Sequence, residues 1–188
     1  MSNRRMQFLG AAVAATLFSM VAASSALASN VTATANVNAG TLTLSSSATP
    51  SVSVTLNGTD QTPSYTLPMS VNDATGSGAG WNVTVTSTTF STGGGSPQTL
   101  STSASTATGA NASCAGGTTC TAPTNSITYP LAVPAGSSAP TAVKLFNAGA
   151  NTGLGNFTVT PTIQVAIPAN TYAGTYTSTV TVAVVSGP

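Results

Sequence analysis

Alternation of apolar and polar residues is the feature that most restricts the fold of this chain. It is clearest in the stretch 78–87, where Trp81, Val83 and Val85 alternate with polar residues. Successive side chains of a strand point to opposite faces of a sheet, so this pattern predicts a strand with one buried face. The small residues just ahead of Trp81 leave the backbone free to turn sharply into that strand.

The same alternation recurs along the chain, and no helical periodicity follows residue 28. It predicts strands over residues 41–44, 52–56, 65–71, 81–87, 127–133, 143–146, 157–167 and 176–185. About eight strands separated by turn residues are typical of an all-β fold, an antiparallel β-sandwich of the Ig-like or Greek-key type.

Two connections and one proline stand out in this predicted sandwich. Strand 65–71, the glycine-rich turn after it and strand 81–87 are expected to form a hairpin-type unit with a bulged connection. Residues 100–123 contain almost only Ser, Thr, Ala, Gly and Asn, which predicts a long Ser/Thr/Gly-rich loop region, with a variable surface excursion favoured over a functional loop. In strand 157–167, Pro161 occupies one position of the inward-facing register.

The first residues have the three parts of an export signal. Two arginines precede an apolar run over residues 8–21, and small residues near its end place cleavage between Ala28 and Ser29. We therefore expect a signal peptide over residues 1–28 and a secreted, single domain over residues 29–188 that makes no membrane contact after cleavage. The alternative is an uncleaved membrane anchor, because the apolar run is almost long enough to span a bilayer.

Charged side chains are nearly absent from the predicted mature chain, which keeps only Asp60, Asp73 and Lys144. That excludes a basic patch for nucleic acid or anionic lipid and an acidic cluster for calcium. General acid–base catalysis needs a group that titrates near the working pH, and the mature chain has neither histidine nor glutamate. Its hydroxyl groups have no base to activate them. We therefore expect no enzymatic activity, no cofactor and no metal.

The two cysteines, Cys114 and Cys120, lie in a glycine-bearing stretch. An even number of cysteines in an exported chain predicts a disulfide, and this pairing is favoured over a free pair or a metal site, because no histidine exists to complete a zinc set. The loop it closes is short. The bridge is expected to pin that loop rather than to hold the domain together.

Trp81 has two alternative roles. It is either a core residue that shares a face with Val83 and Val85, or a stacking surface for a sugar ring with Asn82 as a hydrogen-bond partner. Alternation favours the core, because the face that carries Trp81 is the apolar one. Asp73 is the best candidate for an acid at a carbohydrate site, although capping of its own turn is favoured. The candidate binding residues are thus Trp81, Val83, Asn82 and Asp73.

Two stretches carry a family resemblance: residues 71–85, with their Gly-Ala-Gly-Trp turn, and residues 153–182, with the run Ala-Gly-Thr-Tyr-Thr-Ser-Thr-Val. Both resemble the WxL domain, a surface module of Gram-positive bacteria named for two Trp-x-Leu motifs. The likeness covers roughly residues 40–188. The first motif has valine in place of leucine at Val83, and Val182 occupies the position that matches the second tryptophan.

The resemblance implies non-covalent attachment to the cell wall through peptidoglycan or another wall glycan, alongside other surface proteins. The alternative is a structural subunit of a surface fibre or coat, in which copies of the chain pair their strands. Threonine-rich strands with few charges leave sheet edges open to such pairing. Both functions place the protein at the extracellular surface.

Overall fold

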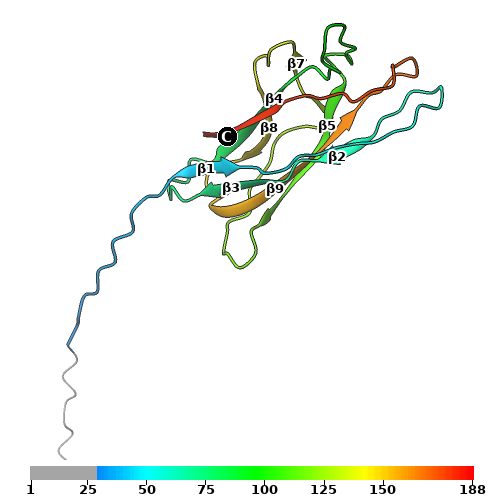
Figure 1. Ribbon diagram of the computed structural model, residues 1–188. Coiled ribbons are helices and arrows are strands. Elements are labelled where there is room, and N and C mark those ends of the chain that lie inside the picture. The colour runs from blue at the N-terminus through cyan, green and yellow to red at the C-terminus, as the bar shows by residue number, and fades with distance from the viewer. Residues whose placement is uncertain (1–28) are drawn as a thin grey trace, which may run out of the picture. The chain divides into compact units, whose positions relative to one another are not determined.

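The computed structural model describes residues 29–188, and the predicted signal peptide over residues 1–28 lies outside the described residues (Figure 1). The chain divides into an N-terminal unit that ends at Asn36 and a compact unit, Val37–Pro188. The described part of the first unit, residues 29–36, contains no helix and no strand. A search of the described residues for a helix long and apolar enough to cross a membrane finds none.

The described chain contains ten strands, all of them in the compact unit. They are β1 (Leu42–Ser45), β2 (Ser64–Thr66), β3 (Met69–Asp73), β4 (Trp81–Thr88), β5 (Ser105–Cys114), β6 (Leu131–Ala132), β7 (Ala135–Gly136), β8 (Val143–Ala148), β9 (Gly155–Val165) and β10 (Val180–Ser186). They form two sheets, which Figure 1 shows as two layers. The predicted β-sandwich is confirmed, with more and shorter strands than expected and one parallel pair, β4 with β7.

The larger sheet has the order β1-β3-β9-β5-β6, and β2 also pairs with β9. Its central strand β9 has β3 and β2 along one edge and β5 along the other. Inside β9, Pro161 is buried as predicted. Its carbonyl accepts a hydrogen bond from the N–H of Leu67 at 3.1 Å, in the gap between β2 and β3. The N–H that proline lacks would point to the same edge, so its loss does not break the ladder with β5.

The smaller sheet has the order β10-β4-β7, and β8 pairs with β4. β10 lies antiparallel to β4 in a continuous register from Val180 opposite Ser87 to Ser186 opposite Trp81. On the other edge of β4, the pairing with β8 shifts between Val83 and Thr84. β10 is therefore an edge strand, and β4 is the centre of this sheet.

A hydrophobic core fills the space between the two sheets. Its largest fully buried side chains include Trp81 from β4, Phe157 from β9 and Met69 from β3. The ring of Trp81 lies 6.0 Å from that of Phe157 and 5.8 Å from that of Phe146, measured between centroids, in tilted geometries that suit aromatic pairs. The predicted inward-facing residues of β3, β4 and β9 thus form one core.

The expected hairpin between strand 65–71 and strand 81–87 is wrong. The structure divides the first strand into β2 and β3, which pair with β9, whereas β4 belongs to the other sheet. The connection over residues 74–80 therefore crosses from one sheet to the other. The alternation of each strand reports which face is buried but does not say which strand lies beside it.

The expectation of irregular structure is wrong for residues 105–114, which form β5. This strand pairs with β9 from Ser105 to Cys114, with a register shift between Ala107 and Gly109. Small side chains suit its position: Ala107 is fully buried beneath the bulky side chains of neighbouring strands. Pairing with a central strand stabilises β5 through its backbone, which residue composition does not report.

Three predicted strands are shorter in the structure or missing. Residues 127–133 contribute only the two-residue strand β6, and β10 begins at Val180 rather than at Tyr176. Residues 52–56 form no strand, although their side chains alternate between partly buried and exposed up to Thr55. This last segment and the residues before β10 line the two sides of a groove.

Candidate ligand-binding groove

The structure places Trp81 in the core, as the alternation favoured. Its side chain is 0% exposed, and its indole N–H donates a hydrogen bond to the carbonyl of Gly153 at 2.8 Å. This bond satisfies the polar atom of a buried tryptophan and ties β4 to the turn before β9. In the folded domain the indole offers no surface to a ligand.

The neighbours of Trp81 are also inaccessible. Val83 is fully buried, and its partners across the sheet are Val184 on β10 and Phe146 on β8. Asn82 points to the other face of the sheet, where its side-chain amide donates to the carbonyl of Gly187 at 2.7 Å. This bond holds the end of the chain against β4.

Asp73 caps its own turn, as the sequence favoured. Its carboxylate accepts hydrogen bonds from the backbone N–H of Thr75 at 3.0 Å and from the hydroxyl of Thr75 at 2.6 Å. Asp73 is buried and forms the end of β3. The four predicted binding residues therefore cluster around β3 and β4, where each has a structural contact.

The predicted disulfide between Cys114 and Cys120 is present, with 5.8 Å between the Cα atoms. The loop that it closes is held against the start of β9 and the residue before it, because the N–H of Ala115 donates to Asn156 O and the N–H of Thr121 donates to Leu154 O. Among the described residues, no group of three or more potential metal ligands occurs.

A groove of about 1120 Å³ opens between two irregular segments of the compact unit. One wall is residues 48–56, which follow β1, and the other is residues 171–180, which lead into β10. Its floor is formed by Tyr65, Leu67, Phe90, Leu100, Val165 and Ile167. The groove is thus the place where the two sheets separate at one side of the sandwich.

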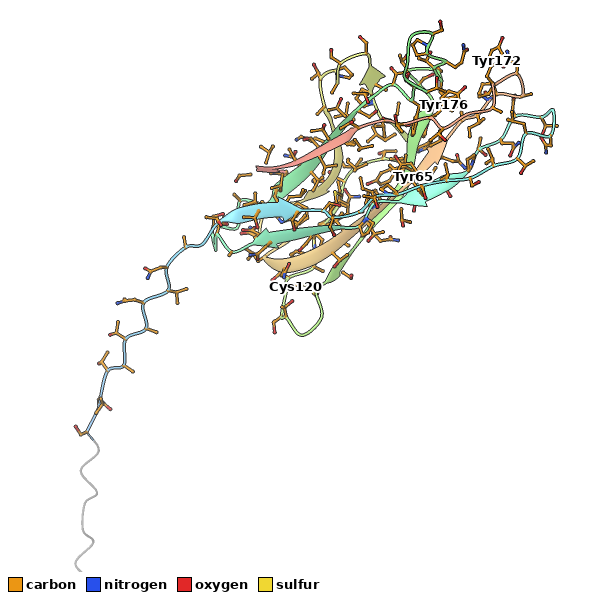
Figure 2. All side chains as sticks on the ribbon, viewed as in Figure 1. Tyr65, Cys120, Tyr172 and Tyr176 are labelled. Carbon is orange, nitrogen blue, oxygen red and sulfur yellow. A yellow bond between two sulfur atoms is a disulfide. The ribbon has the colours of Figure 1, made fainter. Side chains whose placement is uncertain are left out.

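Three of the four tyrosines of the chain line this groove: Tyr65, Tyr172 and Tyr176. Figure 2 shows them toward one end of the domain, away from Cys120. Tyr172 is 69% exposed, and Tyr65 and Tyr176 are partly buried. The hydroxyl of Tyr176 donates to the backbone carbonyl of Tyr172 at 3.0 Å, which ties the Tyr176 side chain to the backbone of the same wall. Burial raises the pKa of Tyr65 above its ordinary value.

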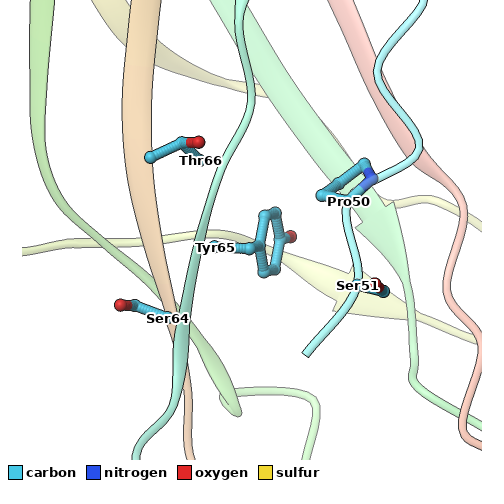
Figure 3. Close-up of a pocket in the computed structure, with 5 residues that line it drawn as sticks. All are labelled: Pro50, Ser51, Ser64, Tyr65 and Thr66. Atoms are coloured by element: carbon cyan, nitrogen blue, oxygen red, sulfur yellow. The ribbon is translucent and has the colours of Figure 1, made fainter. Parts of the chain in front are cut away.

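A smaller pocket of about 380 Å³ adjoins the groove at Pro50, Ser51 and Tyr65. Figure 3 shows the ring of Tyr65 pointing from its strand into the gap beside Pro50, with Ser64 and Thr66 on the opposite face. β2 therefore lies beside the wall segment without pairing with it. Tyr65 belongs to both spaces and joins them.

The first wall of the groove has a backbone that is almost free of partners. Over residues 50–56, the one backbone group that the described chain pairs is the carbonyl of Thr55, which accepts from the side-chain amide of Gln61 at 2.8 Å. The segment is extended (Figure 1), with Val52 and Val54 partly buried and Ser53 between them exposed. It resembles an edge strand that lacks its neighbour.

The bases of the two walls are fixed to each other. Gln61 and Ile167 exchange two backbone hydrogen bonds, at 2.9 and 2.8 Å. The carboxylate of Asp60 accepts a hydrogen bond from the N–H of Ala169 at 2.8 Å. At the other end of the second wall, Ser91 and Thr177 exchange another pair of hydrogen bonds. These contacts anchor the second wall at two places, and Tyr172 lies between them on an exposed turn.

No side chain that lines the groove in the described structure is charged. Aromatic rings, aliphatic floor residues and hydroxyl groups are what it offers to a ligand. The sequence contains one sign of this site that the strand patterns do not bring out, the spacing of Tyr172 and Tyr176 around an Ala-Gly turn. Tyr65 could not be added from sequence, because its neighbourhood depends on how β2 packs.

The fold and the groove define a class of protein, an all-β module with a neutral, aromatic-lined groove. The chain matches the family described as WxL domain surface cell wall-binding over residues 20–188, and it belongs to that family. The search of curated proteins finds no match, and neither does the search of solved structures. Membership confirms the resemblance and makes the protein a cell-wall-associated surface protein.

The two motif positions of the family lie on paired strands. Val182 on β10 lies opposite Val85 on β4, and Val184 lies opposite Val83. Val182 is partly buried and packs against the core that holds Trp81. Both motif positions therefore face the interior of the sandwich rather than the groove.

Proposed function

We propose that this protein binds peptidoglycan and that the tyrosine-lined groove is the binding site. The observation that carries this proposal is the gathering of Tyr65, Tyr172 and Tyr176 around one uncharged groove. A wall-binding family supports attachment to the wall, and the groove supplies a site with matching chemistry. Trp81 contributes from within the core, by fixing β4 in the sandwich.

The chemistry of the groove suits a glycan. The faces of sugar rings carry C–H groups that pack against aromatic rings, and sugar hydroxyls pair with polar groups placed around an apolar floor. Thr171, Thr175 and Ser178 lie beside the tyrosines in the second wall. Because no charge lines the groove, phosphate-bearing wall polymers gain no ion pair there.

The test is retention of the purified protein on insoluble peptidoglycan. Tyr172→Ala removes an exposed ring and is expected to lower affinity about tenfold, or about 1.4 kcal/mol, because the apolar face on which a sugar ring packs is lost. Val185→Ala, at a 50% exposed position on β10 outside the groove, is the matched control. Equal retention of Tyr172→Ala and wild type would contradict the assignment of the groove.

A second candidate function, assembly into a surface fibre or coat, has its own observation. β10 is an edge strand without proline or charge, the features that commonly protect such edges. Val37, at the start of the compact unit, is 94% exposed and adds an apolar side chain that a second copy could cover. Size-exclusion chromatography of the sample used for wall binding separates the two functions. A retained monomer supports glycan binding, and polymers without retention favour assembly.

A further inference from the structure

We propose that the groove selects sugars that carry an N-acetyl group, and that the unpaired backbone of residues 50–56 recognises the acetamido amide. This inference rests on the proposed function of the groove and names the chemical class of its ligand. The predicted ligands are chains of N-acetylated amino sugars, in preference to plain hexose chains or chains with free amino groups.

The first step is the hydrogen-bonding state of the wall. Residues 50–56 are extended, and Thr55 O is the one backbone group there with a partner in the described structure. A ligand that covers this wall removes water from its N–H and C=O groups. Such groups cost free energy when they lose water without gaining a partner. A tightly bound ligand therefore has to supply both acceptors and donors along this edge.

The second step is the shape of the group that can do this. An acetamido group is a planar, peptide-like unit whose N–H and C=O point in opposite directions, so one of them can pair with an unpaired backbone group of this wall while the other faces across the groove. Its methyl group is apolar. Val54 and Leu56 in the wall and Ile167 in the floor offer apolar surface beside the free backbone. A sugar hydroxyl supplies the hydrogen bonds but not the methyl contact.

The third step is charge. No charged side chain lines the groove in the described residues. Asp60, the nearest acid in sequence, is engaged with the N–H of Ala169 at the base of the walls. A free amino group on the sugar is cationic at neutral pH and would lose water here without a counter-charge. Removal of the acetyl group is therefore expected to weaken binding.

Three β-1,4-linked tetrasaccharides test the roles of the acetamido group and of charge. They are built from N-acetylglucosamine, glucosamine and glucose, and they differ only in the group at C2. Titration of the full mature protein by calorimetry or NMR is expected to give at least about tenfold tighter binding of the N-acetylated chain, equivalent to the burial of about two methyl groups. Equal binding of the glucose chain, or of the glucosamine chain, would overturn the inference.

Proline substitutions test the backbone directly. Ser53→Pro and Val52→Pro each remove one N–H from a segment without ladder hydrogen bonds, so the fold is expected to survive. Neighbouring N–H groups of an extended chain point to opposite edges. One variant is expected to lose the preference for the N-acetylated chain, and the other to keep it as the matched control. Unchanged preference in both folded variants would overturn the proposal.

Wall retention of the same samples distinguishes the two levels of the argument. Retention with equal affinity for all three tetrasaccharides, or with affinity for none, overturns N-acetyl recognition and leaves the proposed function standing. Loss of both retention and tetrasaccharide binding overturns the proposed function, and this inference fails with it.

Discussion

At the scale of single residues, Gly153 explains how a lone tryptophan is fixed in the core. Its carbonyl accepts the indole N–H of Trp81, and its backbone has φ of +73°, a region that favours glycine. A Cβ at this position would lie 2.7 Å from Trp81 Nε1 and would also overlap Ala148 Cβ. The turn before β9 therefore approaches the indole as closely as only a glycine allows.

This close approach gives a prediction with a matched control. Gly58 also has positive φ, at +80°, but a Cβ there would meet nothing within 4 Å. Gly58→Ala is expected to cost about 1 kcal/mol of unfolding free energy from backbone strain alone. Gly153→Ala is expected to cost about 3 kcal/mol or more, because overpacking adds to the strain. Urea denaturation measures both. Equal losses would show that contact with the indole adds nothing.

Trp81 and Asp73 show which features of the candidate site the sequence could predict and which it could not. Alternation placed Trp81 with Val83 and Val85 on the buried face, and the turn chemistry of Asp73 predicted its capping role, because both depend on neighbours in sequence. The partner of the indole lies 72 residues away. No local pattern reports such a contact, and none reports that Tyr65 lines the same groove as Tyr172 and Tyr176.

At the scale of elements, β5 and the segment 52–56 exchange the roles that their sequences predict. The Ser- and Ala-rich stretch forms a long strand beside β9, and the Val-rich alternating stretch pairs with nothing in the described structure. Strand pairing depends on which backbone edges meet, and small side chains fit on a strand whose neighbours contribute large side chains to the core. The unpaired Val-rich segment forms one wall of the groove, where its backbone groups remain available for hydrogen bonds with a ligand.

The disulfide belongs to the same scale, because it closes a loop at the end of β5. Replacing Cys114 and Cys120 together with serine is expected to lower the unfolding free energy by about 2 kcal/mol, the loop-closure entropy of so short a loop. Chemical denaturation measures the change. Figure 2 shows Cys120 at the opposite end of the domain from Tyr172, so wall retention of the folded variant is expected to equal that of wild type. Loss of retention would place the wall contact near the loop.

At the scale of the whole molecule, the near absence of charge sets how the protein responds to its surroundings. Asp60, Asp73 and Lys144 are its charged side chains beyond the predicted signal, and histidine, the residue that titrates near neutral pH, is absent. The charge of a wall polymer is therefore expected to have little effect on its affinity for the domain. Binding to the wall is expected to depend weakly on salt, as it does when packing and neutral hydrogen bonds dominate.

The pH dependence of stability follows from two tyrosines. Burial raises the pKa of Tyr65 above 10.0, and burial also raises that of Tyr129, partly offset by a hydrogen bond from Asn125. The folded state thus holds these phenol protons more tightly than the unfolded state. Their contribution to stability is fully present below the unfolded pKa of 10.0 and is lost as pH rises through the folded values.

Unfolding free energy is therefore expected to stay level across neutral pH and to fall above about pH 10, the ordinary pKa of tyrosine. Denaturation midpoints at a series of pH values measure this. Tyr65→Phe removes one of the two ionisations, so its stability should fall less steeply in alkali, whereas Tyr172→Phe, at an exposed position, serves as the control. A stability that changes between pH 6 and 8 would be inconsistent with this account, because the described residues include no histidine, whose side chain titrates there.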